Sequence, residues 1–274
     1  MTSLVLSCAL AVLAYMTALF LIALVRRDNS LADTGWGLGF ILVAVLSFVR
    51  QPAPGARTFL VDGLILLWGL RLAVHIFTRS RKRGEDFRYA KWRTEWGRWF
   101  VLRSYLQVFI LQGTILLVVA VPIMLVNFGP GPRLNVLDFA GAAVWLLGFV
   151  FETVGDAELL RFKRDPANRG RIMSTGLWGL TRHPNYFGES SMWWGISLIA
   201  LSAPNGGLGL VSPALLTFML LRVSGVAMLE KKYEGRPDFA AYARRTSAFI
   251  PWFPRRTEAA TSSDPTYRPG SGQP

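Results

Sequence analysis

LVLSCALAVLAYMTALFLIALV, residues 4–25, contains no charged side chain. The hydrocarbon core of a bilayer is about 30 Å thick and needs about 20 consecutive apolar residues in a helix that crosses it. This stretch therefore predicts a transmembrane helix. No lysine or arginine precedes it, and it is longer than the apolar region of a secretory signal, so we interpret it as a helix that is retained.

Similar apolar stretches continue along the chain of 274 residues, of which 52% are hydrophobic and 17% charged. Soluble domains carry about 25% charged residues, so an ordinary soluble domain is excluded. The predicted spans are 4–25, 31–49, 58–77, 105–126, 136–154, 187–201 and 208–229. We predict an all-α polytopic membrane protein with about seven transmembrane helices, in a single domain over residues 1–253. Residues 254–274 are poor in apolar side chains and are predicted to be a disordered tail.

The basic residues, which give the chain a net charge of +13, indicate its orientation. Nearly all of them lie in segments 26–27, 79–103, 161–182 and from 231 onward, whereas the links of the opposite face hold only Arg50, Arg57 and Arg133. Because basic loops stay in the cytoplasm, we predict an N-terminus outside and a C-terminus inside. Basic charge alternating with spans favours membrane lipids or an anionic ligand as partners rather than nucleic acid.

Polar residues within the predicted spans are functional candidates, because charge is costly inside a membrane. Trp68, Arg71 and His75 lie on one helical face. Arg71 and His75 either contact a ligand or pair with carboxylates of other helices. Glu152, Asp156 and Lys163 share another face if the fifth helix continues through residue 161, and the two acids either bind a ribose or amide or neutralise buried arginines.

Residues 174–189, STGLWGLTRHPNYFGE, are the most distinctive segment. They combine Gly176 and Gly179, which permit close approach of a ligand, with Arg182, His183, Asn185 and Tyr186. Such a group at the start of a helix suits an anion such as phosphate. The alternative is an interfacial helix cap without a ligand.

This segment resembles the signature of the steroid 5α-reductase-like family, including its bacterial members. GEDFRY (84–89), DTGWG (33–37) and RTSAFIPWF (245–253) are similar to the bacterial branch as well. The shorter pattern Arg-His-Pro-x-Tyr is also shared by isoprenylcysteine-type and phospholipid methyltransferases.

The resemblance implies a seven-helix membrane reductase that uses NADPH to saturate an activated C=C bond of a steroid or related lipid enone. It implies a bacterial inner membrane with the cofactor side in the cytoplasm, a hydrophobic lipid or steroid substrate, no metal and no protein partner. The cofactor contacts that it implies fall on Arg71, Asp156, Lys163, Arg171, Arg182, His183, Asn185, Tyr186, Glu189, Arg222, Tyr242 and Arg245.

The family's catalytic acid has a less direct counterpart in this sequence. Trp68 stands where the family has a tyrosine, and an indole cannot act as an acid, so we select Asp33 as the polar group at the substrate carbonyl. The alternative function is an S-adenosylmethionine-dependent membrane methyltransferase. That class shows paired glutamates near its end, whereas here Glu230 is followed by Lys231 and Lys232.

Overall fold

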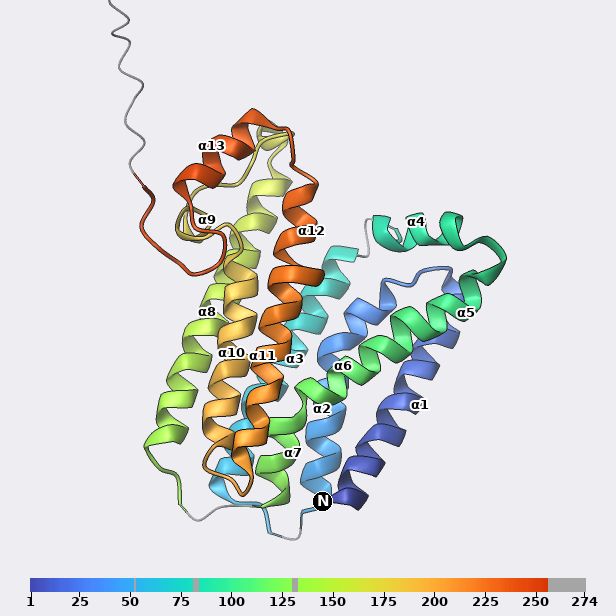
Figure 1. Cartoon of the computed structure of the whole chain (residues 1–274), viewed down its shortest axis with the longest axis vertical. Coiled ribbons are helices and arrows are strands. Elements are labelled where there is room, and N and C mark those ends of the chain that lie inside the picture. The colour runs from blue at the N-terminus through green and yellow to red at the C-terminus, as the bar shows by residue number, and fades with distance from the viewer. Residues whose placement is uncertain (52, 81–83, 130–132, 256–274) are drawn as a thin grey trace, which may run out of the picture.

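The computed structural model describes residues 1–51, 53–80, 84–129 and 133–255, and these form a bundle of long helices (Figure 1). The predicted tail lies outside the described residues from position 256 onward. The helices are α1 (Thr2–Arg26), α2 (Leu31–Val49), α3 (Ala56–Ser80), α4 (Phe87–Trp96), α5 (Phe100–Ser104), α6 (Leu111–Val119), α7 (Val121–Phe128), α8 (Val136–Arg164), α9 (Leu177–Leu180), α10 (Pro184–Ala200), α11 (Val211–Phe218), α12 (Val226–Lys231) and α13 (Pro237–Arg245).

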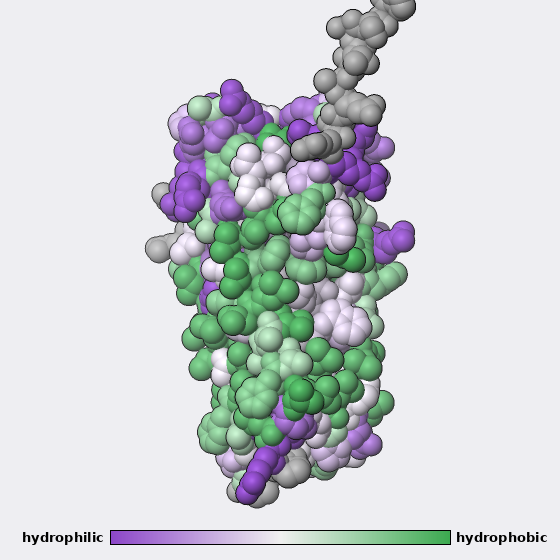
Figure 2. All heavy atoms as spheres, turned by 90° about the vertical axis from the view of Figure 1, so that its left-hand side faces the viewer, coloured by the Kyte–Doolittle hydropathy of each residue, from purple (hydrophilic) through white to green (hydrophobic). Residues whose placement is uncertain are grey.

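The all-α membrane architecture is confirmed. Within the described residues, six helical stretches are long and apolar enough to cross a membrane, and α10, with 17 residues, is a shorter seventh candidate. Figure 2 shows a broad hydrophobic surface between two hydrophilic ends. The N-terminus lies at the end of the bundle opposite to α9 and α13, as an odd number of crossings requires (Figure 1). We call the end that carries α4, α9 and α13 the basic end.

The fourth predicted span, 105–126, differs from the single helix that its hydrophobicity indicates. A π-helical turn at Tyr105–Ile110 joins α5 to α6, α6 ends at Val119, and α7 begins after a break at Ala120. Pro122 explains the break, because proline donates no backbone hydrogen bond and its ring clashes with the preceding turn.

Glycines bring α8 and α10 into close contact. A Cβ atom on Gly148 would lie 2.5 Å from the Gly188 carbonyl oxygen, and one on Gly141 would lie 2.5 Å from the Gly195 carbonyl oxygen. A Cβ atom cannot lie this close to a backbone oxygen, so the two helix backbones approach each other this closely only because both positions are glycine. The two helices therefore hold each other in one register, and α10 begins at a defined position beside α8.

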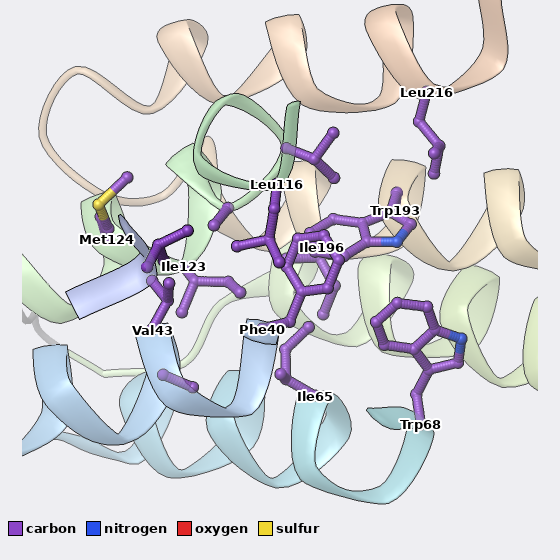
Figure 3. Packing of buried hydrophobic residues seen from close by; sticks show 14 of the residues in the cluster. Phe40, Val43, Ile65, Trp68, Leu116, Ile123, Met124, Trp193, Ile196 and Leu216 are labelled. Carbon is purple, nitrogen blue, oxygen red and sulfur yellow. The ribbon is translucent and has the colours of Figure 1, made fainter. Parts of the chain in front are cut away.

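An aromatic cluster joins α2, α3 and α10 (Figure 3). The Phe40 ring centroid lies 4.6 Å from that of Trp193 and 5.5 Å from that of Trp68, and the two indoles meet edge to face at 5.5 Å. All three side chains are buried. Aromatic pairs at such distances stabilise a core beyond the area that they bury.

A buried ion pair closes the bundle at the end opposite to the basic one. Arg57, in the first turn of α3, donates to both carboxylate oxygens of Asp138 on α8 at 2.7 and 2.9 Å. Asp138 also accepts from the backbone of Asn135 and so completes the cap of α8. Arg57 is therefore part of the core and not of the exposed link where the sequence pattern placed it.

Candidate functional site

A cavity of about 1090 Å³ opens at the basic end. This volume is at the upper limit of typical small-molecule sites. Its wall is formed by the last turns of α3 and α8, the segment 165–173, the starts of α2, α4 and α10, and parts of α12 and α13. The basic side chains that line it are Arg79, Arg88, Lys163, Arg164, Arg169, Arg171, Arg182, Lys232 and Arg236. Such a wall attracts an anion with several negative charges.

The segment before α9 is folded around Glu158 of α8. The Glu158 carboxylate accepts a hydrogen bond from the backbone of Leu177 at 3.0 Å. Gly176 adopts a positive φ of 62°, and a Cβ atom there would lie 2.1 Å from the same carboxylate. A glycine is thus required at this turn, both for its backbone conformation and for the space that it leaves.

Arg182 and His183 connect three parts of the chain. Arg182 forms a forked ion pair with Glu230 of α12, at 2.8 and 3.1 Å, and donates to the carbonyl of Thr246 at 2.6 Å. His183 meets the same Glu230 carboxylate at 3.1 Å and stacks on Tyr186 with ring centroids 5.6 Å apart. Both residues line the cavity, and both also hold its walls together.

The segment after α13 covers α9. The Thr181 hydroxyl donates to the Phe249 carbonyl, and the Ser247 carbonyl accepts from the backbone of Arg182. The Tyr242 hydroxyl donates to the Trp178 carbonyl. Burial raises the pKa of Tyr242 above its usual value, more than the neighbouring Arg182 lowers it, so this phenol remains a donor at neutral pH.

A buried charge cluster lies deeper in the bundle, between α3 and α8. Arg71 contacts Glu152 at 2.5 Å and Asp156 at 2.6 Å. The Trp68 indole donates to Glu152 at 3.0 Å, and His75 lies 3.5 Å from Asp156. Arg71 and His75 thus lie beside carboxylates of another helix, as one of the two hypotheses for them expects. The continuation of α8 to Arg164, on which this face depended, is also observed.

Asn185 and Glu189 stand one helical turn apart on α10. Asn185 lines the cavity, and its buried Oδ1 atom has no hydrogen-bond partner among the described residues. A buried amide oxygen without a donor is unusual and calls for an explanation, such as a ligand. Glu189 lies near the Glu152 and Asp156 carboxylates, so it belongs to the charge cluster instead of the cavity wall.

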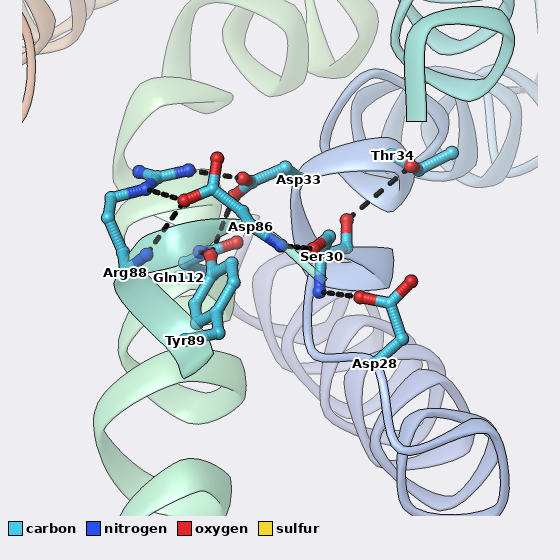
Figure 4. Close-up of polar contacts among 8 residues, drawn as sticks. All are labelled: Asp28, Ser30, Asp33, Thr34, Asp86, Arg88, Tyr89 and Gln112. Atoms are coloured by element: carbon cyan, nitrogen blue, oxygen red, sulfur yellow. Dashed lines mark hydrogen bonds and ion pairs between the residues drawn. The ribbon is translucent and has the colours of Figure 1, made fainter. Parts of the chain in front are cut away.

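Asp33, selected as the catalytic group, lies at the start of α2 and lines the cavity (Figure 4). One of its carboxylate oxygens accepts a hydrogen bond from the Arg88 guanidinium at 2.6 Å, and the other accepts from the Tyr89 hydroxyl at 2.8 Å. Gln112 donates to that hydroxyl at 3.4 Å. Asp33 is therefore a carboxylate held between a guanidinium and a phenol.

The predicted site residues fall into three groups. Those that line the cavity are Asp33, Lys163, Arg171, Arg182, His183, Asn185, Tyr186 and Tyr242. Arg71, Asp156 and Glu189 form the charge cluster. Arg222 and Arg245 are exposed and lie outside the cavity wall as described.

Five further residues of the cavity wall were not predicted from the sequence, namely Arg79, Arg88, Tyr233, Arg236 and Phe239. Arg236 donates to the Gly170 carbonyl at 2.7 Å and so ties the start of α13 to the segment after α8. The local signal was the Arg-Pro step at 236–237, which marks a helix start. Nothing near it in the sequence indicates which distant segment it contacts.

A comparison with protein families identifies the family of this chain. Residues 19–246 match the model of a family described as proteins of unknown function, DUF1295. The chain belongs to the DUF1295 family. The matched residues extend from α1 to Thr246, so they include both the cavity and the charge cluster.

A relative in this comparison is the uncharacterized protein C594.04c of Schizosaccharomyces pombe. It is 23% identical over 218 residues, which are 71% of this chain and 63% of the relative. The chain thus spans less than two thirds of the length of that relative.

Proposed function

We propose that this DUF1295 protein is an NADPH-dependent reductase that saturates an activated C=C bond of a steroid or related lipid enone. The observation that carries the proposal is the basic cavity, which is lined by Asn185 with a buried amide oxygen that has no hydrogen-bond partner among the described residues. A ligand with phosphates at one end and an amide at the other would satisfy both features. The resemblance of residues 176–189 to steroid 5α-reductase-like proteins supports the same ligand.

The phosphate end of the ligand would meet the exposed Arg164, Arg169 and Arg171. Guanidinium groups bind phosphate through two parallel hydrogen bonds, and a pyrophosphate together with a 2′-phosphate gives three phosphates to bind. The excess of basic residues over the needs of a pyrophosphate favours NADPH over NADH.

The amide end would meet Asn185, whose Oδ1 atom can accept from the NH2 of a carboxamide. When bound, such a cofactor supplies a hydride to the β-carbon of an enone. Holding the ring against Asn185 is the contribution of the chain, because small errors in alignment reduce the rate of transfer strongly.

Asp33 is the proposed polar group at the substrate carbonyl, and it acts together with Tyr89. The Asp33 carboxyl group accepts a hydrogen bond from Arg88 at 2.6 Å and orients the Tyr89 hydroxyl, which donates to it at 2.8 Å. The proposed orientation places the basic end in the cytoplasm, where NADPH is available.

Nicotinamide oxidation by the purified protein tests the proposal. We expect NADPH to be consumed with at least one member of a panel of steroid enones, and NADPH to bind more tightly than NADH. Arg171→Ala removes one charge-assisted hydrogen bond, worth about 1.5–3 kcal/mol, so NADPH affinity should fall at least about tenfold and by more than NADH affinity. Arg98→Ala is the matched control, because Arg98 is exposed at the basic end outside the cavity wall as described.

The alternative methyltransferase makes the opposite prediction. It would bind S-adenosylmethionine and would oxidise neither NADPH nor NADH with any enone. That combination of results would exclude the reductase. Equal affinity of the unchanged protein for NADPH and NADH would remove the assigned role of the arginines at 164–171.

A further inference from the structure

A second hollow, of about 530 Å³, lies on the outside of the bundle between α3 and α8. We call it the lateral groove. It is lined by Leu67, Leu70, Arg71, Val74, His75, Thr78, Thr153, Ala157 and Leu160. Both helices are membrane-spanning candidates, and the groove lies along their middle and basic-end turns.

The rim of the lateral groove is built for contact with acyl chains. Leu67, Leu70 and Val74 are exposed by 51%, 47% and 60%, within a stretch apolar enough to cross a membrane. In a bilayer these side chains face lipid, since no water is present at that depth. The groove therefore opens sideways into the membrane, whereas the basic cavity opens at the end of the bundle.

Most of the lateral groove is apolar, but a few polar groups lie at its floor. Arg71 and His75 border it, and the Thr153 hydroxyl is buried there without a hydrogen-bond partner among the described residues. A buried hydroxyl in an apolar setting is stabilised only when it is hydrogen-bonded. A ligand of this groove would therefore carry a long apolar body and an oxygen that reaches Thr153.

The charged groups around the floor of the groove determine which kind of lipid headgroup can place its oxygen at Thr153. Arg71 is already paired with both Glu152 and Asp156, and Glu189 adds a third carboxylate nearby. Three acidic groups thus surround one guanidinium, with His75 positive only when protonated. A fatty acid or an anionic phospholipid would need a free cation beside its headgroup, and the Arg71 guanidinium is already engaged by Glu152 and Asp156. A hydroxyl or carbonyl group would not.

We propose that the lateral groove is a binding site for a neutral, single-headed lipid, with its hydroxyl or carbonyl oxygen at Thr153 and its apolar body along α3 and α8. The site is separate from the basic cavity. Leu159 and Ile76 face the cavity, while their neighbours Leu160 and His75 face the groove. The groove can therefore bind its lipid whether or not the protein is a reductase.

Photocrosslinking in nanodiscs tests the proposal, with a long-chain alcohol that carries a diazirine in its chain as the probe. We expect crosslinks to concentrate in residues 67–78 and 153–160. Unlabelled long-chain alcohol should compete, and the carboxylic acid of equal chain length should not. Equal competition by the acid, or crosslinks spread evenly over all lipid-facing helices, would overturn the proposal without any variant.

Two variants locate the site further. Thr153→Val keeps the shape of the side chain and removes its hydroxyl, so affinity for the alcohol should fall about five- to tenfold, the range of one hydrogen bond. Ala157→Trp should fill the groove and abolish the localised crosslinks. Leu147→Trp, at an exposed position of α8 outside the groove wall as described, is the control and should leave them unchanged. Unaltered crosslinking in Ala157→Trp would place the lipid elsewhere.

Discussion

Single residues of this protein carry charge in places where charge is costly, and each does so with a partner. Arg57 and Asp138 illustrate this, with side chains that are 2% and 0% exposed. Taking two ions out of water costs several kcal/mol each, and only close contact offsets that cost. The arrangement therefore depends on both residues being present.

Removing one partner of this pair should be more harmful than removing both. We expect Arg57→Met to lower the free energy of unfolding by about 3–5 kcal/mol, because Asp138 is left buried and unpaired. Arg57→Met combined with Asp138→Leu should recover much of the loss. Arg50→Met is the control, since Arg50 is exposed and donates to a single serine hydroxyl. Unfolding in mixed detergent micelles measures all three, and equal stability of the Arg50 and Arg57 variants would contradict the expectation.

The sequence shows which residues of this kind exist but not how they pair. The spacing of Trp68, Arg71 and His75 places them on one face of α3, and that face is observed to meet Glu152 and Asp156. The pairs of Arg57 with Asp138 and of Arg182 with Glu230 join residues 81 and 48 positions apart. Local periodicity contains no information about contacts over such separations, since they depend on how whole helices pack.

Among the elements, the packing of α8 against α10 depends most on glycines, which have no side chain to keep the two helices apart. We expect Gly148→Leu to destabilise the protein at or above the upper end of the about 1–3 kcal/mol typical of overpacking. The new Cβ atom would lie 2.5 Å from the Gly188 oxygen and 2.8 Å from the Met192 nitrogen, both backbone atoms that cannot turn aside. The measurement is again the free energy of unfolding in mixed micelles.

Gly63→Leu is the matched control for this change. Gly63 also lies in a membrane-spanning candidate, on α3, but a Cβ atom there would meet nothing within 4 Å. This variant should be neutral or slightly stabilising, because glycine is a poor helix former. If both leucine variants lost the same stability, helix propensity or insertion, not close packing, would account for the loss at Gly148.

The elements also show where hydrophobic patterns stop being sufficient. Length and apolar content predict six of the spans well, because a bilayer imposes that length. They do not predict that residues 105–126 divide at Ala120, or that α4 lies across the basic end of the bundle (Figure 1). Pro122 was a visible signal for the first of these, whereas the orientation of α4 depends on contacts such as that of Arg88 with Asp33.

At the scale of the whole molecule, the separation of charge predicts its orientation in the membrane. We expect Arg169→Cys, at the basic end, to react with an impermeant maleimide only after cells are permeabilised. Gly207→Cys is exposed at the opposite end and should react in intact cells. Cys8, which is buried and the single cysteine of the chain, would be replaced by alanine in both variants. Labelling of Arg169→Cys in intact cells would put the cavity outside and exclude NADPH as its ligand.

The basic cavity also has a consequence for how the protein is made. Arg182 enters the growing chain 64 residues before Thr246, whose carbonyl it contacts in the finished molecule. A ribosome adds about 5–20 residues per second, so this arginine waits between about 3 and 13 s for its acceptor. During that interval α10 is already available for insertion while the wall of the cavity is incomplete. A nascent chain released between residues 231 and 246 would thus hold its membrane-spanning candidates and lack a finished site.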